Sequence, residues 1–176
     1  MDEAALFKLT HGIYVLGTKD EANNRFAGSV VDAVMQVANK PFMIALSCHN
    51  NSYTKLCIEK ARCFSLSVVG ADVEPFVIAN FGFQTSRNVD KWAKVDYITV
   101  NNLPYLKDTM ARIEAKVTEI IAYDSNTLFL AEVVDSWDCK CGDALTYNQY
   151  RAYFKDKVIE SFNKYRQQLL KEKSNV

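Results

Sequence analysis

The sequence predicts a mainly β domain of the α+β class, built as an antiparallel barrel with short flanking helices and one helix at the C-terminal end. Three observations support this fold. Runs rich in β-branched and aromatic residues recur between turn-forming segments, the helical patterns among them are short, and the last strong pattern is helical. A doubly wound sheet would need long helices between its strands, so a barrel fits better.

Six or seven strands are expected. The apolar run 42–48 favours a strand buried on both faces, whereas serine alternates with apolar residues in 63–69, which favours one buried face. The same alternation recurs in 110–123. The polar segment 19–25 is turn-prone and joins the first two strands as a hairpin. The predicted strands are 12–18, 26–37, 42–48, 63–69, 97–100, 110–123 and 128–134.

Two short helices are predicted among these strands. Asn51 or Ser52 caps the first, which ends before the strand that starts at Cys63. Asp72 caps the second, in which Pro75 is tolerated because it falls in the first turn.

The C-terminal segment differs from the rest in pattern and in charge. From Tyr150 an apolar stripe at helical spacing predicts a helix. From Arg151 the chain carries seven basic and three acidic residues, a charge of +4, and the remainder carries 14 basic and 18 acidic residues, a charge of −4. We divide the chain into a barrel domain, 1–148, and an amphipathic helix, 149–176, that packs on the barrel or on a second copy.

The composition excludes several classes of protein. The 176 residues are 49% hydrophobic, and 21 basic residues balance 21 acidic ones, so one compact domain of zero net charge is expected. Such a chain has no overall attraction to nucleic acid or membrane lipid, and neither is expected as a partner. No apolar run is long enough to span a membrane, and the acidic start does not resemble a signal peptide, which predicts a cytoplasmic protein.

Familiar catalytic and metal-binding motifs are missing from the sequence. GxGxxG, Walker, GxSxG and HExxH patterns do not occur. The five cysteines are odd in number, and most are expected to be buried thiols. Cys139 and Cys141 form a close pair without a second pair or added histidines, so no metal site is expected. With two histidines, acid–base chemistry is scarce, which favours a bound redox cofactor.

Three stretches could hold such a cofactor. The segment 27–38 offers backbone and small side chains to a flat ring, and 50–54 offers hydroxyls, amides and a helix N-terminus to a phosphate. The segment 81–91 adds Ser86, Arg87 and Lys91 beside aromatic residues. Each stretch taken alone also has an ordinary interpretation, and the first two are more often a barrel strand and a helix cap than a binding site. The third is also compatible with a solvated loop after a helix.

Together, and in this order, the three stretches resemble the flavin reductase-like family. The quoted motifs are Gly28 through Gln36-Val37 to Pro41, Asn50-Asn51-Ser52-Tyr53-Thr54, and Phe81-Gly82 through Ser86-Arg87 to Asp90-Lys91-Trp92. They are similar to those of the branch with flavoredoxins and the flavin domain of rubredoxin-fused flavoproteins. The resemblance implies an FMN-binding split β-barrel and a homodimer with FMN at the subunit interface.

The resemblance also implies the residues that hold the cofactor. The first stretch would lie against the flavin ring, the second near the ribityl chain and phosphate, and the third would complete the phosphate contacts. Asn126 stands near where the family has a histidine. The implied residues are Asp32, Ala33, Val34, Met35, Gln36, Val37, Ala38, Asn51, Ser52, Tyr53, Thr54, Ser86, Arg87, Lys91 and Asn126.

The implied activity is that of an oxidoreductase, either an NAD(P)H-dependent flavin reductase or a flavoredoxin-like electron carrier. NAD(P)H or a redox protein would donate electrons, and flavin, iron or a small carrier would accept them. The chemistry would take place on the flavin, so no catalytic side chain is assigned. The alternatives are a non-catalytic flavin- or haem-binding barrel, a dimeric structural module, and a barrel of the pyridoxamine-phosphate-oxidase type.

The sequence departs from the family pattern in the first two motifs. The family's Asn-Thr is Asp32-Ala33 here, and a histidine after Thr54 is replaced by Lys55. A carboxylate that faced the ring would disfavour a reduced, anionic flavin and lower its reduction potential.

Overall fold

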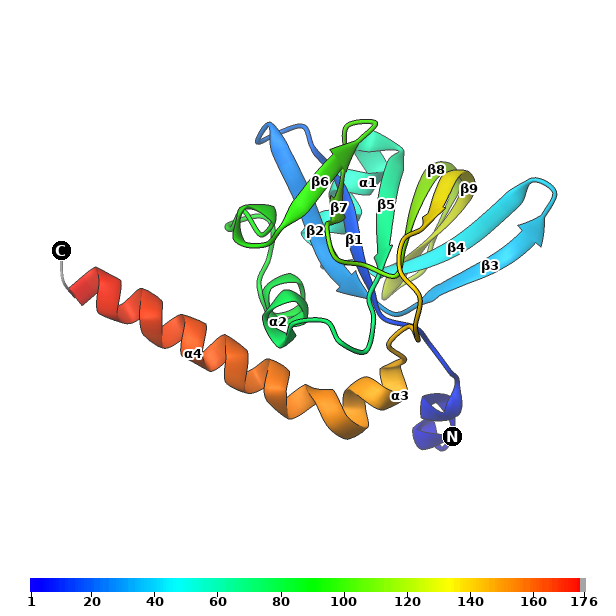
Figure 1. Ribbon diagram of the computed structural model, residues 1–176. Coiled ribbons are helices and arrows are strands. Elements are labelled where there is room, and N and C mark those ends of the chain that lie inside the picture. Colours follow the sequence, from blue (N-terminus) through cyan, green and yellow to red (C-terminus); the bar gives the residue numbers. More distant parts are fainter. Residues whose placement is uncertain (175–176) are drawn as a thin grey trace.

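The computed structural model describes residues 1–174 and contains nine strands and several short helices before a long C-terminal one (Figure 1). The strands are β1 (Tyr14–Asp20), β2 (Arg25–Val31), β3 (Val34–Asn39), β4 (Phe42–His49), β5 (Cys63–Val68), β6 (Tyr97–Val100), β7 (Leu103–Leu106), β8 (Ala111–Ala122) and β9 (Asn126–Asp138). The helices are η1 (Glu3–Lys8), α1 (Tyr53–Ala61), α2 (Pro75–Phe83), η2 (Trp92–Lys94), α3 (Tyr147–Gln149), the π-helical η3 (Tyr150–Phe154) and α4 (Lys155–Ser174).

Seven strands form one antiparallel sheet that curls into a split barrel. Their order is β2-β1-β5-β8-β9-β4-β3, so β2 and β3 are its two edges although they follow each other in the chain. The predicted single strand 26–37 is therefore two strands. The break is at Asp32 and Ala33, where the backbone N–H of Val34 donates to the backbone oxygen of Asp32 at 2.9 Å and closes a tight turn.

The strand β5 is buried on both faces, and the prediction of one buried face is wrong. Ser65 and Ser67 are both 0% exposed. The hairpin of β6 and β7 covers them: Ser65 Oγ donates to the backbone oxygen of Pro104 at 2.5 Å, and the backbone N–H of Leu106 donates to Ser67 Oγ at 3.0 Å. Each serine hydroxyl thus forms a hydrogen bond with a backbone group of the hairpin that covers it.

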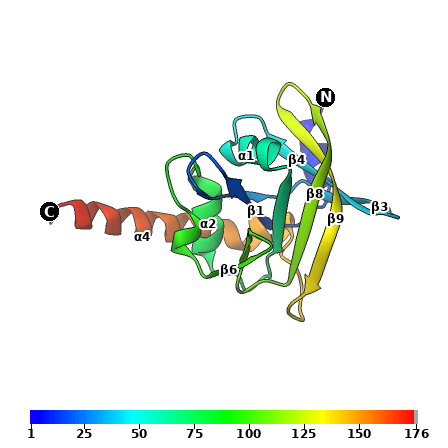
Figure 2. The ribbon, with the colours of Figure 1, turned by 90° about the horizontal axis from the view of Figure 1, so that it is seen from above.

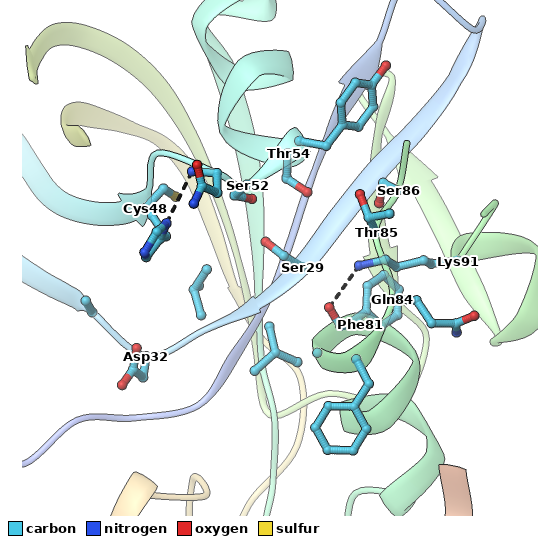
Figure 3. A pocket seen from close by; sticks show the side chains of 18 of the residues that line it. Ser29, Asp32, Cys48, Ser52, Thr54, Phe81, Gln84, Thr85, Ser86 and Lys91 are labelled. Carbon is cyan, nitrogen blue, oxygen red and sulfur yellow. Dashed lines mark hydrogen bonds between the residues drawn. The ribbon is translucent and has the colours of Figure 1, made fainter. Parts of the chain in front are cut away.

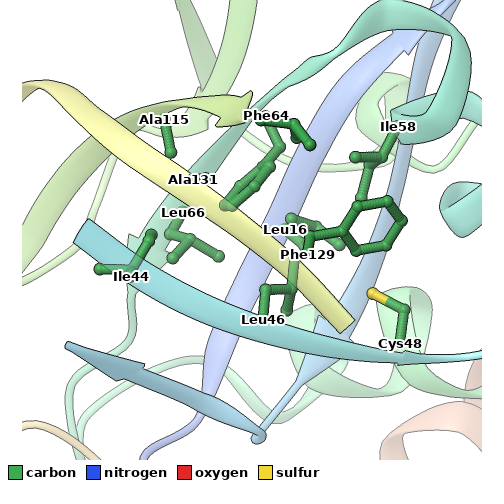
Figure 4. Close-up of a cluster of buried hydrophobic side chains, with 11 residues drawn as sticks. Leu16, Ile44, Leu46, Cys48, Ile58, Phe64, Leu66, Ala115, Phe129 and Ala131 are labelled. Atoms are coloured by element: carbon green, nitrogen blue, oxygen red, sulfur yellow. The ribbon is translucent and has the colours of Figure 1, made fainter. Parts of the chain in front are cut away.

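Two separate groups of apolar side chains form the core. Inside the barrel, Leu16 packs with residues of β4, β5, β8 and β9, all of which Figure 4 draws as sticks. On the outer face, Val15 packs with residues of α2 and with Val158 of α4. Val15 and Leu16 enter different groups because successive strand residues point to opposite faces. The helix α2 is thereby fixed against β2.

The C-terminal helix packs on α2 with one part only. Phe162 contacts Phe83 with ring centroids 5.3 Å apart, and Tyr165 contacts Phe76 at 5.1 Å. Beyond them Leu170 is 64% exposed, and the end of α4 extends away from the barrel (Figures 1 and 2). Residues 175 and 176 of the predicted helix lie outside the described residues. Within the described range, none of the helices has the length and apolar character needed to cross a membrane.

The helix caps differ in part from those predicted. Ser52 is the N-cap of α1, as predicted, but its side chain makes no capping hydrogen bond. The N-cap of α2 is Glu74 instead of Asp72, whose carboxylate accepts a hydrogen bond from Lys140 Nζ at 2.5 Å.

The cysteines are all free thiols, and only some match the expectation of burial. Cys48 and Cys57 are buried, Cys63 is half-buried, and Cys139 and Cys141 are exposed. In residues 1–174 no three His, Cys, Asp or Glu side chains cluster in a way that could hold a metal ion.

Candidate functional site

A cavity of about 640 Å³ opens where β2 ends, at the split of the barrel. The ends of β2 and β4, the start of α1, and the end of α2 with the loop after it form its walls (Figure 3). The lining residues are Ser29, Val30, Val31, Asp32, Ala33, Ser47, Cys48, His49, Asn51, Ser52, Tyr53, Thr54, Phe81, Gly82, Phe83, Gln84, Thr85, Ser86, Lys91 and Asn126.

Lys91 places a buried positive charge in the wall of this cavity. Its side chain is 1% exposed, and Nζ donates to the backbone oxygens of Gly28 and Phe81, each at 2.9 Å. No carboxylate among residues 1–174 pairs with it, and burial lowers its pKa from 10.5 to about 8. An ammonium has three donors, so one remains for a ligand. In Figure 3 the nitrogen of Lys91 points toward the cavity.

The loop that carries Lys91 is fastened to β2 by Ser86. Ser86 Oγ donates to the backbone oxygen of Gly28 and accepts from its N–H, both at 2.9 Å. One guanidinium nitrogen of Arg25 also donates to the backbone oxygens of Ser86 and Arg87 at 2.6 and 3.0 Å. A side chain at position 28 would come within 2.7 Å of the Phe81 ring, so glycine is required for this approach. The Ser86 hydroxyl is therefore engaged by backbone.

The N-terminus of α1 provides a second place for an anion. The first N–H groups of a helix have no partner within it and carry its positive dipole end. The first turn of α1 contains no acidic residue, and the N-cap side chain makes no hydrogen bond to these groups. Ser29 Oγ, in the cavity wall, is buried and without a hydrogen-bond partner among the described residues. Both features suit a phosphorylated ligand with hydroxyl or carbonyl oxygens.

Tyr53 connects the cavity rim to the hairpin of β1 and β2. Its hydroxyl donates to Asp20 at 3.0 Å and accepts from Asn23 Nδ2 at 2.9 Å. The guanidinium of Arg87 lies over the Tyr53 ring, 4.7 Å from its centroid. Arg87 is thus placed at the rim, outside the cavity lining.

Nine of the fifteen predicted site residues line the cavity and six do not. Those in the lining are Asp32, Ala33, Asn51, Ser52, Tyr53, Thr54, Ser86, Lys91 and Asn126. The others are Arg87 and five residues of β3: Val34, Met35, Gln36, Val37 and Ala38. Val34 packs against the barrel interior, and Met35 and Val37 are 64% and 45% exposed on the edge strand.

Eleven lining residues are not among the fifteen predicted ones. They are Ser29, Val30, Val31, Ser47, Cys48, His49, Phe81, Gly82, Phe83, Gln84 and Thr85. Eight of them lie within the predicted stretches 27–38 and 81–91, and only Ser47, Cys48 and His49 lie outside all three stretches. A signal for His49 existed, because it directly precedes the 50–54 stretch, and in the sheet it pairs with Asn126. Its ring nitrogen Nδ1 accepts from the N–H of Asn51 at 3.2 Å. Burial raises the pKa of the Cys48 thiol to about 12, which makes it a poor nucleophile at neutral pH.

Comparisons with known proteins agree on one family. The flavin reductase like domain matches residues 6–155. A high molecular weight rubredoxin of Moorella thermoacetica is 33% identical over 152 residues, which are 85% of this chain and 66% of that protein. A ferric-chelate reductase (NAD(P)H) of Archaeoglobus fulgidus is 31% identical over 160 residues, 90% of this chain and 94% of the other. This chain therefore spans about two thirds of the first relative and nearly all of the second.

Solved structures share the fold. Flavin reductase PheA2 aligns with a TM-score of 0.70 at 25% identity over 83% of this chain and 93% of its own. The FMN-binding protein of Thermus thermophilus aligns with a TM-score of 0.71 at 22% identity over 80% of this chain and 82% of its own. The family match over residues 6–155 and the shared split barrel together show that this chain belongs to the flavin reductase-like domain family.

Proposed function

We propose that this protein is an FMN-binding oxidoreductase, acting as an NAD(P)H-dependent flavin reductase or a flavoredoxin-like electron carrier. The observation that carries the proposal is the Lys91 ammonium, which is buried without a counter-ion among residues 1–174 and lines the same cavity as the N-terminus of α1. The names of the relatives support it, since one is a ferric-chelate reductase that uses NAD(P)H and a structural neighbour binds FMN.

The residues of the cavity fit a flavin mononucleotide. Lys91 and the N–H groups at the start of α1 would share the phosphate as charge-assisted donors. Ser29 Oγ would gain the hydrogen-bond partner that it lacks. Val30, Val31 and Phe81 supply apolar surface for a flat ring.

The protein's own part in the reaction is binding and orientation. A bound flavin supplies two-electron chemistry, which the side chains present here do not. The titratable groups in the lining are Asp32, Cys48, His49, Tyr53 and Lys91. The Lys91 ammonium would bind a negatively charged group of the ligand. The Cys48 thiol stays protonated at neutral pH, and the Tyr53 hydroxyl donates a hydrogen bond to Asp20. The cavity would thus bind and orient the flavin.

The proposal is tested by loading the protein with FMN and measuring bound flavin after desalting, by its absorption spectrum. Wild-type protein is expected to retain flavin, and Thr54→Ala and Lys91→Met to retain at least tenfold less. Lys60→Met, on the exposed side of α1, is the matched control and should bind like wild type. Wild-type retention in both Thr54→Ala and Lys91→Met would refute the site. Bleaching of bound flavin by NADH or NADPH under nitrogen then separates a reductase from a non-catalytic flavin-binding barrel.

We also propose that the protein is a homodimer that pairs through the region of β3. This edge strand exposes Met35 and Val37, and Phe42 at the start of β4 is 59% exposed beside it. Exposed apolar side chains on an edge strand favour pairing with another chain. Light scattering should give a dimer for wild type and for Leu56→Glu on α1, and a monomer for Met35→Glu with Val37→Lys. A dimer in the double variant would exclude this interface. The cytoplasmic location stays a prediction from the sequence.

A further inference from the structure

Two walls of the cavity contribute to the proposed anion site, and they come from segments that are distant in the chain. One wall is the start of α1, with Ser52 and Thr54, and the other is the loop after α2, with Ser86 and Lys91 (Figure 3). A phosphate held by both walls requires a fixed separation between them, because hydrogen bonds weaken steeply when their geometry changes. The contacts that fix this separation lie partly outside the cavity lining.

Asp20, the last residue of β1, is a buried carboxylate outside the cavity lining. Its side chain is 1% exposed. One carboxylate oxygen accepts a hydrogen bond from the Tyr53 hydroxyl at 3.0 Å, and the other accepts from Asn23 Nδ2 at 2.8 Å. The second oxygen also lies 3.6 Å from Nε of Arg25. A buried carboxylate is costly, and these partners compensate for the loss of water.

Two partners of Asp20 each lead to one wall of the cavity. Tyr53 is the first residue of α1, so its hydrogen bond to Asp20 holds the start of that helix. Arg25 is the first residue of β2, and its guanidinium donates to the backbone oxygens of Ser86 and Arg87 in the loop. The Arg87 guanidinium in turn lies over the Tyr53 ring. One carboxylate thus joins the start of α1 to the loop that carries Lys91.

The contribution of Asp20 to anion binding has to be geometric. A carboxylate repels a phosphate, so it cannot attract one directly. An amide at position 20 would offer one oxygen in place of two, and its N–H groups would meet the donors of Asn23 or Arg25. It would also lack the charge that pairs with Arg25. Only a carboxylate of this length therefore serves both partners at once.

We propose that Asp20 is a positioning residue that sets the separation of the two anion-binding walls and thereby makes the site select flavins that carry a phosphate. The inference rests on the proposed function, because it concerns the phosphate end of the same cavity. The apolar surface for the ring, at Val30 and Val31, lies at the opposite end of β2 from Arg25. Asp20 should therefore control the preference for FMN over riboflavin, which has the same ring and no phosphate.

The test compares the affinities of FMN and riboflavin by fluorescence titration. Wild type should bind FMN more tightly than riboflavin. Asp20→Asn should bind FMN about tenfold more weakly than wild type and should bind riboflavin as wild type does. Tyr53→Phe removes one hydroxyl and should cause a smaller loss of the same kind. The double variant should lose no more than Asp20→Asn alone, because both changes break one connection.

A matched control and a second measurement separate positioning from a general loss of stability. Glu21→Gln removes the same charge from the next residue, which is exposed, and should behave as wild type. Amide hydrogen exchange of the flavin-free protein should be faster in Asp20→Asn than in wild type at 51–55 and 84–91, and unchanged in β8 and β9. Circular dichroism shows which variants are folded, and Tyr53→Phe tests the same connection by a milder change.

The outcomes distinguish this inference from the proposed function. Wild-type FMN binding in Asp20→Asn, or an equal loss of FMN and riboflavin, would overturn the role of Asp20 and leave the function intact. So would equal binding of the two flavins by wild type. If wild type bound no flavin, the proposed function would be wrong, and calorimetry with inorganic phosphate would decide on Asp20. Weaker phosphate binding in Asp20→Asn than in Glu21→Gln would then support the inference, and any other result would overturn it.

Discussion

The buried ammonium of Lys91 makes the stability of the flavin-free protein depend on pH in an unusual direction. Its pKa is about 8 in the folded protein and 10.5 ordinarily. Below pH 8 both the folded and the unfolded chain carry this proton. Between these two pKa values the unfolded chain keeps the proton and the folded chain has lost it, so the free energy of unfolding rises with pH. The expected rise from this group is about 1.4 kcal/mol at pH 9 and about 2.5 kcal/mol at pH 10.

Urea unfolding of the flavin-free protein at about pH 7.5, 9 and 10 measures this effect. Other groups also titrate in this range, so the quantity of interest is the difference between wild type and Lys91→Met at each pH. The free energy of unfolding of wild type, minus that of Lys91→Met, should increase as the pH rises. Lys60→Met removes an exposed lysine, and its free energy of unfolding should depend on pH as that of wild type does. A difference between wild type and Lys91→Met that stays constant over this range would refute the reasoning.

Flavin binding should show the opposite dependence. A bound phosphate favours the charged form of Lys91 and raises its pKa, so binding takes up a proton above pH 8. The affinity of wild type should fall about tenfold per pH unit above that point. The affinity of Lys91→Met should stay level, because it has no proton to take up at this position. Fluorescence titration with FMN at the same pH values measures both.

Three further predictions concern single side chains. Gly82→Ala should stabilise the protein by about 0.5–1 kcal/mol in thermal unfolding, because it improves the helix and meets no atom; a loss of stability would contradict the open space. Gly28→Ala should destabilise it by about 1–3 kcal/mol, because the new methyl group would lie 2.7 Å from Phe81; unchanged urea unfolding would show that this ring can move. Asp32→Asn should raise the reduction potential of bound FMN by on the order of 30 mV, the Coulomb energy of one charge at about 10 Å. Spectroelectrochemistry measures that shift, and an unchanged potential would mean that the carboxylate does not face the ring.

Much of the fold could be predicted from local patterns. The strands at 42–48, 97–100 and 110–123 and the helix from Tyr53 onward carry clear alternation or helical spacing, and each is present. The strand β7, which pairs with β6, was not predicted, because Pro104 lies within it and a proline argues against a strand. Its turn, Asn101 and Asn102, has positive φ at both residues, a geometry that glycine signals more strongly than asparagine does.

The remaining differences come from contacts that are distant in sequence. The burial of Ser65 and Ser67 depends on a hairpin 39 residues further along the chain, so their alternation with apolar residues gave the wrong exposure. Lys91 was identified by a motif, but its contact with Gly28 joins residues 63 positions apart, and no pattern predicts its burial.

The split between β2 and β3 bears on how the protein must be handled. These two strands are the edges of the sheet, and the proposed flavin site lies where one ends and the other begins. Ser86 and Lys91 hydrogen-bond the outer backbone groups of β2 at Gly28, whereas β3 exposes apolar side chains such as Met35. An exposed apolar edge strand is a template for aggregation. A ligand bound at that seam, and a second copy over β3, would both shield β3. Purification in the presence of excess FMN should therefore raise the yield of monodisperse protein. Removal of the flavin should make the protein aggregate faster on storage.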